Sequence, residues 1–244
     1  MVGRTPVEIR RVNPIPVPSG QVQPIVVRPQ PPVPVYISWT SGVNADQARV
    51  TIEAVREVLA LAQQNRGVKI FGSGRWSQGD YSSADWYQTR AATNRDLGYG
   101  PQTNADQIIN LMWYEPWQKA EGHLDVMVVD QDTWAGVGTN NSVFGLTFPH
   151  LAMVQSVARF NDPGPLAPTL LRVFKRVIHH EFGHLLGAPN RHTNVEENLG
   201  LHCTNFCCLR QGLSREIWIR QLYEEEAAGI IFCRECTANL RGQR

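Results

Sequence analysis

Two histidines, His180 and His184, lie four residues apart, and a glutamate, Glu181, directly follows the first of them. An α-helix has about 3.6 residues per turn, so this spacing stacks both imidazoles on one helix face, where they can bind one divalent ion. The neighbouring carboxylate can reach a water molecule in an open coordination position. The pattern therefore predicts a zinc site with its own general base, which is suited to hydrolysing peptide bonds.

The sequence around this motif predicts the helix that the chemistry needs. Pro168 and Thr169 form a typical helix start, and Gly187 and Pro189 form a typical end. Between them, apolar residues recur every three or four positions: Leu170, Leu171, Phe174, Val177, Ile178, Phe182, Leu185 and Leu186. The alternative interpretation is a core helix whose histidines only form hydrogen bonds.

All five cysteines of the chain lie in its last fifth: Cys203, Cys207, Cys208, Cys233 and Cys236. The last two form a CxxC pair and the first two form a second close pair, which is typical of tetrahedral zinc sites with four sulfur ligands. Disulfide bonds are the alternative. Charged residues between Arg4 and Arg11 interrupt any apolar run near the start, so we expect no signal peptide, a cytoplasmic location and reduced thiols.

The order of these features resembles that of a known family. The HExxH stretch, Gly187, the His202-Cys203 pair, another nearby cysteine and a terminal CxxC resemble the archaemetzincins, zinc metallopeptidases of the metzincin clan. Their pattern is HExxHxxGxxH followed at once by cysteine, then another cysteine, a Met-containing turn and a final CxxC. The resemblance covers about residues 170–240. It implies a metzincin-like α/β (α+β) fold with a mixed sheet, an active-site helix and a small zinc-stabilised C-terminal subdomain.

The third zinc ligand departs from the family pattern. Asn190 stands where the family has its third histidine, and His192 and His202 follow it. We favour His202, because Cys203 follows it as in the family and because Gly200 lets the chain turn back toward the helix. His192 is the alternative third ligand, since a short loop after the helix could also deliver it to the ion.

The turn after the first cysteine pair also departs from the pattern. If Cys207 is the family's second cysteine, Leu209 occupies the methionine position, whereas if Cys208 is, Arg210 occupies it. The turn supplies an apolar floor beneath the imidazoles, and Leu preserves the volume and polarity of Met whereas Arg does not. We therefore predict a structural zinc whose ligands are Cys203, Cys207, Cys233 and Cys236. Cys208 is the alternative ligand.

The expected function is a zinc-dependent metallopeptidase that acts on peptide or protein substrates, with one catalytic and one structural Zn²⁺. Zinc held by three neutral imidazoles lowers the pKa of its bound water from about 15.7 to about 7, and Glu181 accepts the proton and passes it to the leaving amine. The sequence assigns no second electrophile; His150, His179 and Arg210 are candidates without a supporting pattern. Two alternatives are a zinc-stabilised binding protein without turnover and a secreted, disulfide-linked protein with one zinc site.

Composition divides the chain into an arm and one enzyme domain. Residues 1–33 are rich in proline, which lacks the donor for a strand ladder and favours extended polyproline conformations, so we expect a flexible arm. Its alternative role is to bind an aromatic-lined groove on a partner. Residues 34–244 can bury a sound core, with residues 34–187 as a sheet-and-helix subdomain and residues 188–244 as a C-terminal subdomain with the cysteines.

The domain alternates between strand and helix patterns. The expected strands cover residues 33–39, 68–71 and 124–129, and the expected helices cover residues 44–64, 106–114 and 214–228. The near-continuous apolar run at 124–129 suits a strand with neighbours on both sides. Residues 72–100 lack periodicity and are expected to be a loop, and residues 130–140 an ordinary turn.

Residues 142–147 and 153–160 are expected to form two strands joined near His150. In a zinc peptidase of this class an extended substrate commonly lies along an edge strand above the metal, and this pair is the candidate for that role.

Charge and hydropathy argue against two classes of partner. The chain has 23 basic and 22 acidic residues and a formal net charge of +1, without a basic stripe that could neutralise phosphates. No apolar run approaches the roughly 18 residues of a membrane span. We therefore expect neither nucleic acid nor a membrane as a partner.

Overall fold

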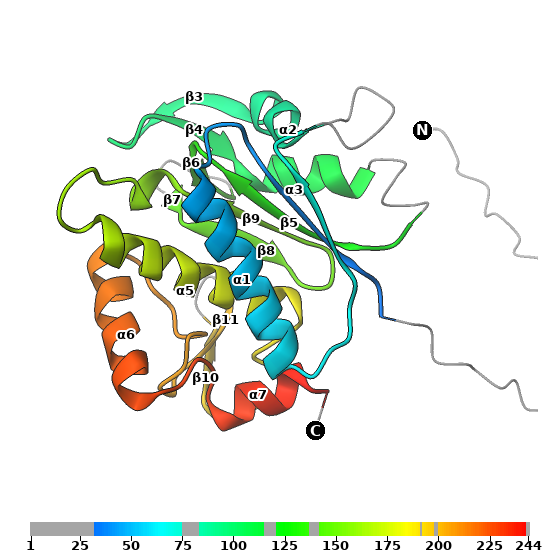
Figure 1. Ribbon diagram of the computed structural model, residues 1–244, viewed down its shortest axis with the longest axis vertical. Coiled ribbons are helices and arrows are strands. Elements are labelled where there is room, and N and C mark those ends of the chain that lie inside the picture. Colours follow the sequence, from blue (N-terminus) through cyan, green and yellow to red (C-terminus); the bar gives the residue numbers. More distant parts are fainter. Residues whose placement is uncertain are drawn as a thin grey trace, which may run out of the picture. The chain divides into compact units, whose positions relative to one another are not determined.

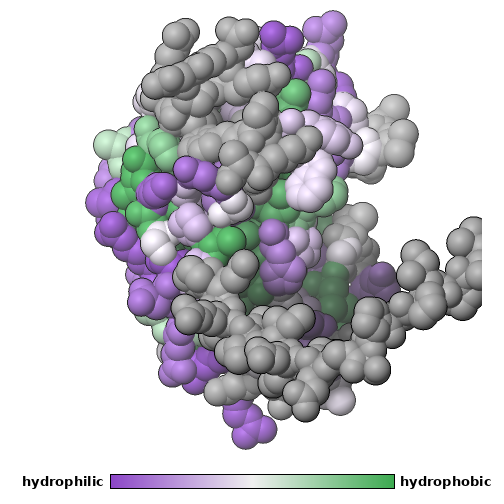
Figure 2. Space-filling model, turned by 90° about the vertical axis from the view of Figure 1, so that its right-hand side faces the viewer, coloured by the Kyte–Doolittle hydropathy of each residue, from purple (hydrophilic) through white to green (hydrophobic). Residues whose placement is uncertain are grey.

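The computed structural model describes residues 32–74, 83–114, 121–136, 142–190, 192–197 and 200–242. The expected arm lies outside this part of the chain, apart from Pro32 and Val33. Pro32–Arg244 forms one compact unit (Figure 1). Among the described residues, no helix has both the length and the apolar character that crossing a membrane requires. The face in Figure 2 shows hydrophobic residues in patches between hydrophilic ones, as is usual for protein surfaces.

A five-stranded sheet forms the centre of this unit, with the strand order β2-β1-β5-β9-β8. Its members are β1 (Val35–Trp39), β2 (Val68–Gly72), β5 (Leu124–Val129), β8 (Gly145–Phe148) and β9 (Ala152–Ser156). The strands pair in parallel except for β8, which runs antiparallel to β9 at the edge. The central place of β5 confirms the prediction for its apolar run, because such a strand is buried on both faces.

Two long helices, α1 (Ala45–Leu61) and α5 (Ala167–Leu185), lie on one face of this sheet (Figure 1). α1 begins at a capping box, in which the Asn44 side chain accepts the Gln47 N–H and the Gln47 side chain accepts the Asn44 N–H. Apolar side chains of both helices pack with those that β1, β5 and β9 direct to this face. α5 also contacts β8, and this contact brings the motif helix beside the edge strand.

The opposite face carries two shorter helices, α2 (Ala84–Arg90) and α3 (Ala105–Tyr114). Met127 of β5 lies in the core on this side, together with Ile108 and Met112 of α3. Successive residues of β5 thus enter cores on opposite faces, as the strand period of about two residues requires.

A second sheet has the order β3-β4-β6-β7. Its strands are β3 (Ala92–Asp96), β4 (Pro101–Asn104), β6 (Asp132–Trp134) and β7 (Ser142–Val143). Two expectations were wrong here: residues 72–100 contain a helix and a strand, and residues 130–140 contain β6. The buried carboxylate of Asp132 accepts hydrogen bonds from Arg159 Nε and Gln102 Nε2, each at 2.7 Å. Gln102 and Arg159 are far from Asp132 in the sequence, and such contacts stabilise polar strands that have no apolar periodicity. The sequence pattern therefore did not indicate these strands.

The strand predicted at 142–147 is divided between the two sheets. β7 pairs with β6, whereas β8 pairs with β9, and the buried Phe144 lies between β7 and β8. The strand predicted at 153–160 ends as β9 and continues into a short 3₁₀ helix, η1 (Ala158–Phe160). The hairpin of β8 and β9 around His150 is confirmed.

The C-terminal region begins with an antiparallel pair, β10 (Val195–Glu197) and β11 (Leu201–Cys203). Helices α6 (Arg215–Ala228) and α7 (Arg234–Leu240) follow, and the first confirms the helix predicted at 214–228. Arg176 of α5 donates to both carboxylate oxygens of Glu225 of α6 at 2.7 Å, and both side chains are buried. This buried ion pair connects helix α6 of the C-terminal region to the motif helix α5.

Candidate metal centres

Helix α5 presents His180 and His184 on one face, one turn apart. Their Nε2 atoms are 3.1 Å apart, and the rings meet edge to face with their centroids 4.5 Å apart. Two nitrogens bound to one tetrahedral zinc at about 2.0–2.1 Å are about 3.3 Å from each other. The two Nε2 atoms therefore already have the separation of two ligands of one ion.

A third imidazole reaches this pair from His202 in β11. Its ligand nitrogen belongs to a set with those of His180 and His184 in which all distances are within 4.8 Å. Two local features place it: Gly200 has a φ of +115°, which side-chain-bearing residues rarely adopt, and the strand pairing aligns Glu196 with His202. The expected turn back toward the helix is therefore present.

Hydrogen bonds select the same tautomer for all three imidazoles. Nδ1 lies 2.8, 2.8 and 3.1 Å from a backbone carbonyl oxygen in His180, His184 and His202, the carbonyls belonging to Cys208, Ala188 and Gly200. A carbonyl oxygen only accepts, so each Nδ1 carries the hydrogen and each Nε2 keeps its lone pair. Carbonyl partners of this kind hold ligand rings in place in metal sites.

His180 and His184 are also held in the neutral form that binds metal. Burial, with a smaller contribution from the other imidazoles, lowers the pKa of His180 well below its usual value. Burial, with a contribution from His202, lowers the pKa of His184 to about 3. Protons therefore compete weakly for these nitrogens at neutral pH.

Glu181 faces the same cleft from the next position of the helix. Its carboxylate Oε2 accepts a hydrogen bond from the Thr147 hydroxyl at 2.6 Å. Burial raises the pKa of Glu181 to about 7, and the Thr147 bond opposes this rise. A Cβ at Gly145 would lie 3.0 Å from Glu181 Cγ, so the glycine leaves room for the side chain. A buried carboxyl with a pKa near neutrality is suited to accept and return a proton.

A cleft of about 470 Å³ contains all four of these side chains. Strand β8 forms part of its lining, and the segment around Leu201 and Leu213 forms another part. These two leucines are 36% and 60% exposed, which makes that side of the cleft apolar. Trp218 also lines the cleft, and its ring meets that of His180 edge to face with the centroids 5.1 Å apart.

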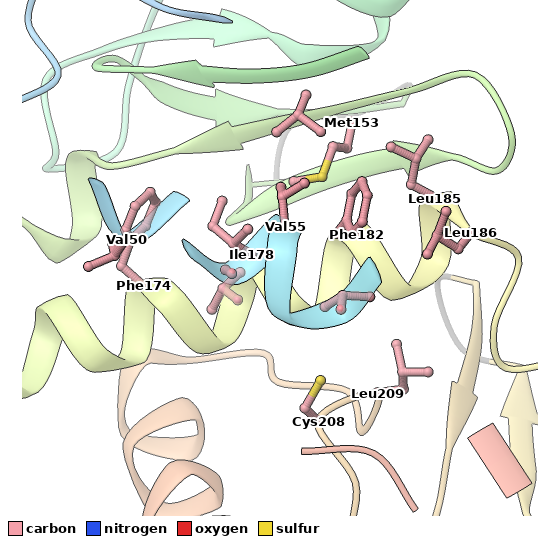
Figure 3. Packing of buried hydrophobic residues seen from close by; sticks show 14 of the residues in the cluster. Val50, Val55, Met153, Phe174, Ile178, Phe182, Leu185, Leu186, Cys208 and Leu209 are labelled. Atoms are coloured by element: carbon pink, nitrogen blue, oxygen red, sulfur yellow. The ribbon is translucent and has the colours of Figure 1, made fainter. Parts of the chain in front are cut away.

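Leu209 lies under the motif helix, where the family pattern has methionine. Figure 3 shows Leu209 and Cys208 on the side of α5 that faces away from Phe182 and Met153. Leu209 is fully buried, and a Cβ at Gly183 would lie 2.9 Å from its Cδ2. The glycine of the motif therefore permits a close approach of this turn, which also carries the carbonyl that holds His180.

A second cluster of donors lies beside the first, where His192 meets the sulfur atoms of Cys203, Cys233 and Cys236. The thiol of Cys207 interacts with those of Cys203, Cys233 and Cys236, and all five cysteines of the chain carry free thiols. Sγ of Cys203 and Sγ of Cys233 are 3.8 Å apart. Two sulfurs on one tetrahedral zinc at about 2.3 Å are about 3.8 Å apart, so the spacing fits such an ion. The interactions with Cys203 and Cys233 raise the pKa of Cys207. Four neighbouring thiolates need a bound cation to be stable.

The remaining candidates lie in different parts of the structure. Cys208 is buried in the apolar core, and burial raises the pKa of its thiol. His179 bonds to Glu57 at 2.8 Å, and Arg210 bonds to Glu224 at 2.7 Å, so both are used as structural contacts. Of the three residues named as possible second electrophiles, His150 lines the cleft. The Nε2 of His192 lies 3.3 Å from Cys236 Sγ, in the sulfur cluster.

Sequence reasoning missed Thr147. Nothing in its neighbourhood in the sequence marks it, because its contact with Glu181 depends on how β8 packs against α5. The carbonyls that hold the three imidazoles carry no sequence signal at all, since every residue has one.

The chain was compared with known proteins. It aligns with a crystal structure of archaemetzincin from Methanopyrus kandleri over 89% of this chain and 98% of that one, with a TM-score of 0.54 and 19% sequence identity. The fold is archaemetzincin-like. No protein-family model matches the sequence, and no curated protein matches it either. The archaemetzincin-like fold confirms the mixed α/β architecture, with a cysteine and histidine cluster near the C-terminus.

Proposed function

We propose that this chain is a zinc-dependent metallopeptidase in which His180, His184 and His202 hold the catalytic ion and Glu181 is the general base. The observation that carries the proposal is the convergence of ligand nitrogens from three imidazoles beside a buried carboxylate in one cleft. The archaemetzincin-like fold supports it. A second, structural zinc would be held by Cys203, Cys207, Cys233 and Cys236.

Zinc in this setting supplies a Lewis acid that acidifies water and stabilises negative charge on oxygen. Glu181 accepts the proton of the attacking water and donates it to the leaving amine, and a pKa near neutrality favours both transfers. Thr147 fixes Oε2 of the carboxylate through its 2.6 Å hydrogen bond, which would leave the other oxygen, Oε1, to accept the proton. The carbonyls bonded to the three Nδ1 atoms keep the imidazoles oriented throughout.

Strand β8 positions the substrate in this proposal. Within the described residues β8 pairs only with β9, so the backbone groups on its other edge are available to an extended peptide. The cleft is lined by β8 from Gly145 to Thr147, directly beside Glu181. A peptide paired with this edge would therefore pass the histidines with its carbonyl groups near the ion. The exposed Leu201 and Leu213 would contact apolar side chains of the peptide.

Replacement of the base tests the proposal. Glu181→Gln should keep the metal content of the parent, about two zinc ions per chain, and lose hydrolysis of a diverse peptide library by a factor of at least about 10². Glu196→Gln, an exposed carboxylate in β10, is the matched control and should cleave as the parent does. Parental rates in Glu181→Gln would remove Glu181 from the mechanism. A zinc-loaded parent that cleaves nothing would instead indicate a binding protein.

A further inference from the structure

His192 lies in the segment that separates the motif helix from His202, yet its side chain turns toward the sulfur cluster. The imidazole is 7% exposed, and its Nε2 is 3.3 Å from Cys236 Sγ. Its ligand atom also lies within 4.8 Å of the sulfurs of Cys203 and Cys233. By distance alone, His192 could be a ligand in this cluster, in competition with Cys207.

The other ring nitrogen of His192 decides between a ligand and a hydrogen-bond donor. Nδ1 accepts the backbone N–H of Asn194 at 3.2 Å, so it carries no hydrogen. Glu235 Oε2 is 3.8 Å from the same nitrogen, beyond hydrogen-bond distance, and it instead accepts a bond from the Asn194 side chain at 3.2 Å. The hydrogen of the neutral ring is therefore on Nε2, the atom that faces sulfur.

This arrangement is the reverse of that in the catalytic cluster. In His180, Nδ1 donates to a carbonyl and Nε2 offers a lone pair. In His192, Nδ1 accepts and Nε2 offers a hydrogen. An Nε2 that carries a hydrogen cannot bind a metal ion, but it can donate to a thiolate.

We propose that His192 is an N–H donor to the Cys236 thiolate of a four-sulfur zinc centre and binds neither ion. Four thiolates on a dication leave a net charge of −2, which donors directed at sulfur partly offset. Cys233 already has two such donors, its Sγ lying 3.4 Å from the Cys236 N–H and 3.6 Å from Asn205 Nδ2. His192 supplies the corresponding donor for Cys236. Its role is to slow the loss of zinc, and it does not depend on peptidase activity.

Cobalt spectroscopy on the full chain separates a donor from a ligand, because only the sulfur centre gives thiolate-to-cobalt charge-transfer absorption. His192→Phe keeps a ring and removes the donor, and we expect the intensity of this absorption and the tetrahedral ligand-field bands to stay as in the parent. Cys207→Ser should reduce the charge-transfer intensity by about a quarter, since one of four thiolates is lost. Altered ligand-field bands in His192→Phe, or an unchanged intensity in Cys207→Ser, would overturn the assignment.

Zinc release measures the effect of the donor itself. We expect transfer of zinc from the sulfur centre to a chelator to be about tenfold faster in His192→Phe than in the parent. His192→Gln keeps an N–H donor and should restore most of the parental rate. The exposed neighbour Thr193 provides the control, and Thr193→Ala should release zinc as the parent does. Equal rates in His192→Phe and the parent would refute the proposal.

A measurement on the unaltered sequence covers the case in which a variant does not fold. Nitrogen NMR of the zinc-loaded parent, labelled at histidine, should show a proton on Nε2 of His192. A nitrogen without a proton at this position, with the shift of a metal ligand, would show that His192 binds zinc.

Discussion

His202 and Cys203 are adjacent in strand β11, but they belong to different donor clusters. Successive residues of a strand direct their side chains to opposite sides, so this short strand separates the histidine cluster from the sulfur cluster. An ion that fixes Cys203 therefore also fixes the backbone that carries His202. The two centres share one structural support.

This shared strand predicts coupling between the centres. Cys236→Ser should remove the ion from the sulfur cluster and also weaken zinc binding at the histidine cluster by about tenfold, because β11 loses its anchor. Competitive titration with a chromophoric chelator measures both affinities. Cys208→Ala is the control, since Cys208 lies in the apolar core, and it should retain both ions. A parental affinity of the histidine cluster in Cys236→Ser would show that the centres are independent.

The bond from Thr147 to Glu181 predicts a shift in the pH dependence of hydrolysis. The hydroxyl stabilises the charged carboxylate, so Thr147→Val, which keeps the shape and removes the donor, should raise the pKa of Glu181. The base must be ionised to accept a proton, and we therefore expect the acidic limb of kcat/KM to move about one pH unit upward. Thr147→Ser keeps the donor and should keep the parental profile. Identical profiles for Thr147→Val and the parent would argue against this contact.

The parts of the site that depend on local sequence could be predicted, and the parts that depend on tertiary contacts could not. Helix α5, its two histidines and the clustered cysteines are encoded by spacings of three and four residues, which a sequence displays directly. His202 is preferred over His192 through its neighbour Cys203 and through Gly200, which lets the chain turn back toward the helix. The role of His192 could not be predicted, because it depends on the backbone N–H of Asn194 and on the fold that brings Cys236 beside it.

In the fold, too, local sequence patterns could be predicted and contacts between distant residues could not. The central strand β5 and the capped helix α1 were predicted because their apolar patterns are continuous and their ends carry turn and cap residues. The second sheet was missed because its strands are short and polar. The burial of Asp132 there is stabilised by Arg159, 27 residues away in the sequence, which neutralises it, and by Gln102, which also donates to it. Stabilisation by a distant charge leaves no periodic signal.

The contacts of Glu57 in α1 predict that the folded protein loses stability in acid. Its carboxylate accepts hydrogen bonds from His179 at 2.8 Å and from Lys175 at 2.6 Å, and these lower its pKa to about 2 from the usual 4.5. A carboxyl whose pKa is lowered by folding adds stability above its unfolded pKa and loses it as the pH falls through the folded pKa. The contribution of Glu57 should therefore decline between about pH 4.5 and about pH 2.

Denaturant unfolding of Glu57→Gln and the parent across this range measures that contribution. The difference in the free energy of unfolding should be largest above pH 5 and vanish toward pH 2, and solvent screening of a side chain that is 42% exposed keeps it at about 1 kcal/mol or less. The exposed Glu196→Gln serves as the control, with an effect within about 0.5 kcal/mol throughout. A difference that grows as the pH falls would contradict the sign of the shift.

Gly183 lies inside the motif helix, and we expect its replacement with alanine to destabilise the protein, which is opposite to the usual effect of this substitution in a helix. Replacing a helix-interior glycine with alanine normally stabilises a helix by about 1 kcal/mol. Here the added Cβ would lie 2.9 Å from Leu209 Cδ2 and 3.1 Å from Phe232 Cε1, so the turn beneath the helix must move. We expect Gly183→Ala to destabilise the zinc-loaded protein by about 1–3 kcal/mol. Movement of the turn also displaces the Cys208 carbonyl that holds His180, so zinc affinity should fall with stability.

A double-mutant cycle with Leu209→Ala identifies the contact responsible. Leu209→Ala alone leaves a cavity and should cost about 2–5 kcal/mol, but in the Gly183→Ala background it also removes the clash. The combined cost should therefore be smaller than the sum of the single costs by at least about 0.5 kcal/mol, measured by denaturant unfolding. Additive costs would place the strain of Gly183→Ala elsewhere, against the Phe232 ring. Leu209 and the Cys208 carbonyl that holds His180 belong to one turn. Relief of the clash in the double variant should therefore also restore zinc affinity that is lost in Gly183→Ala.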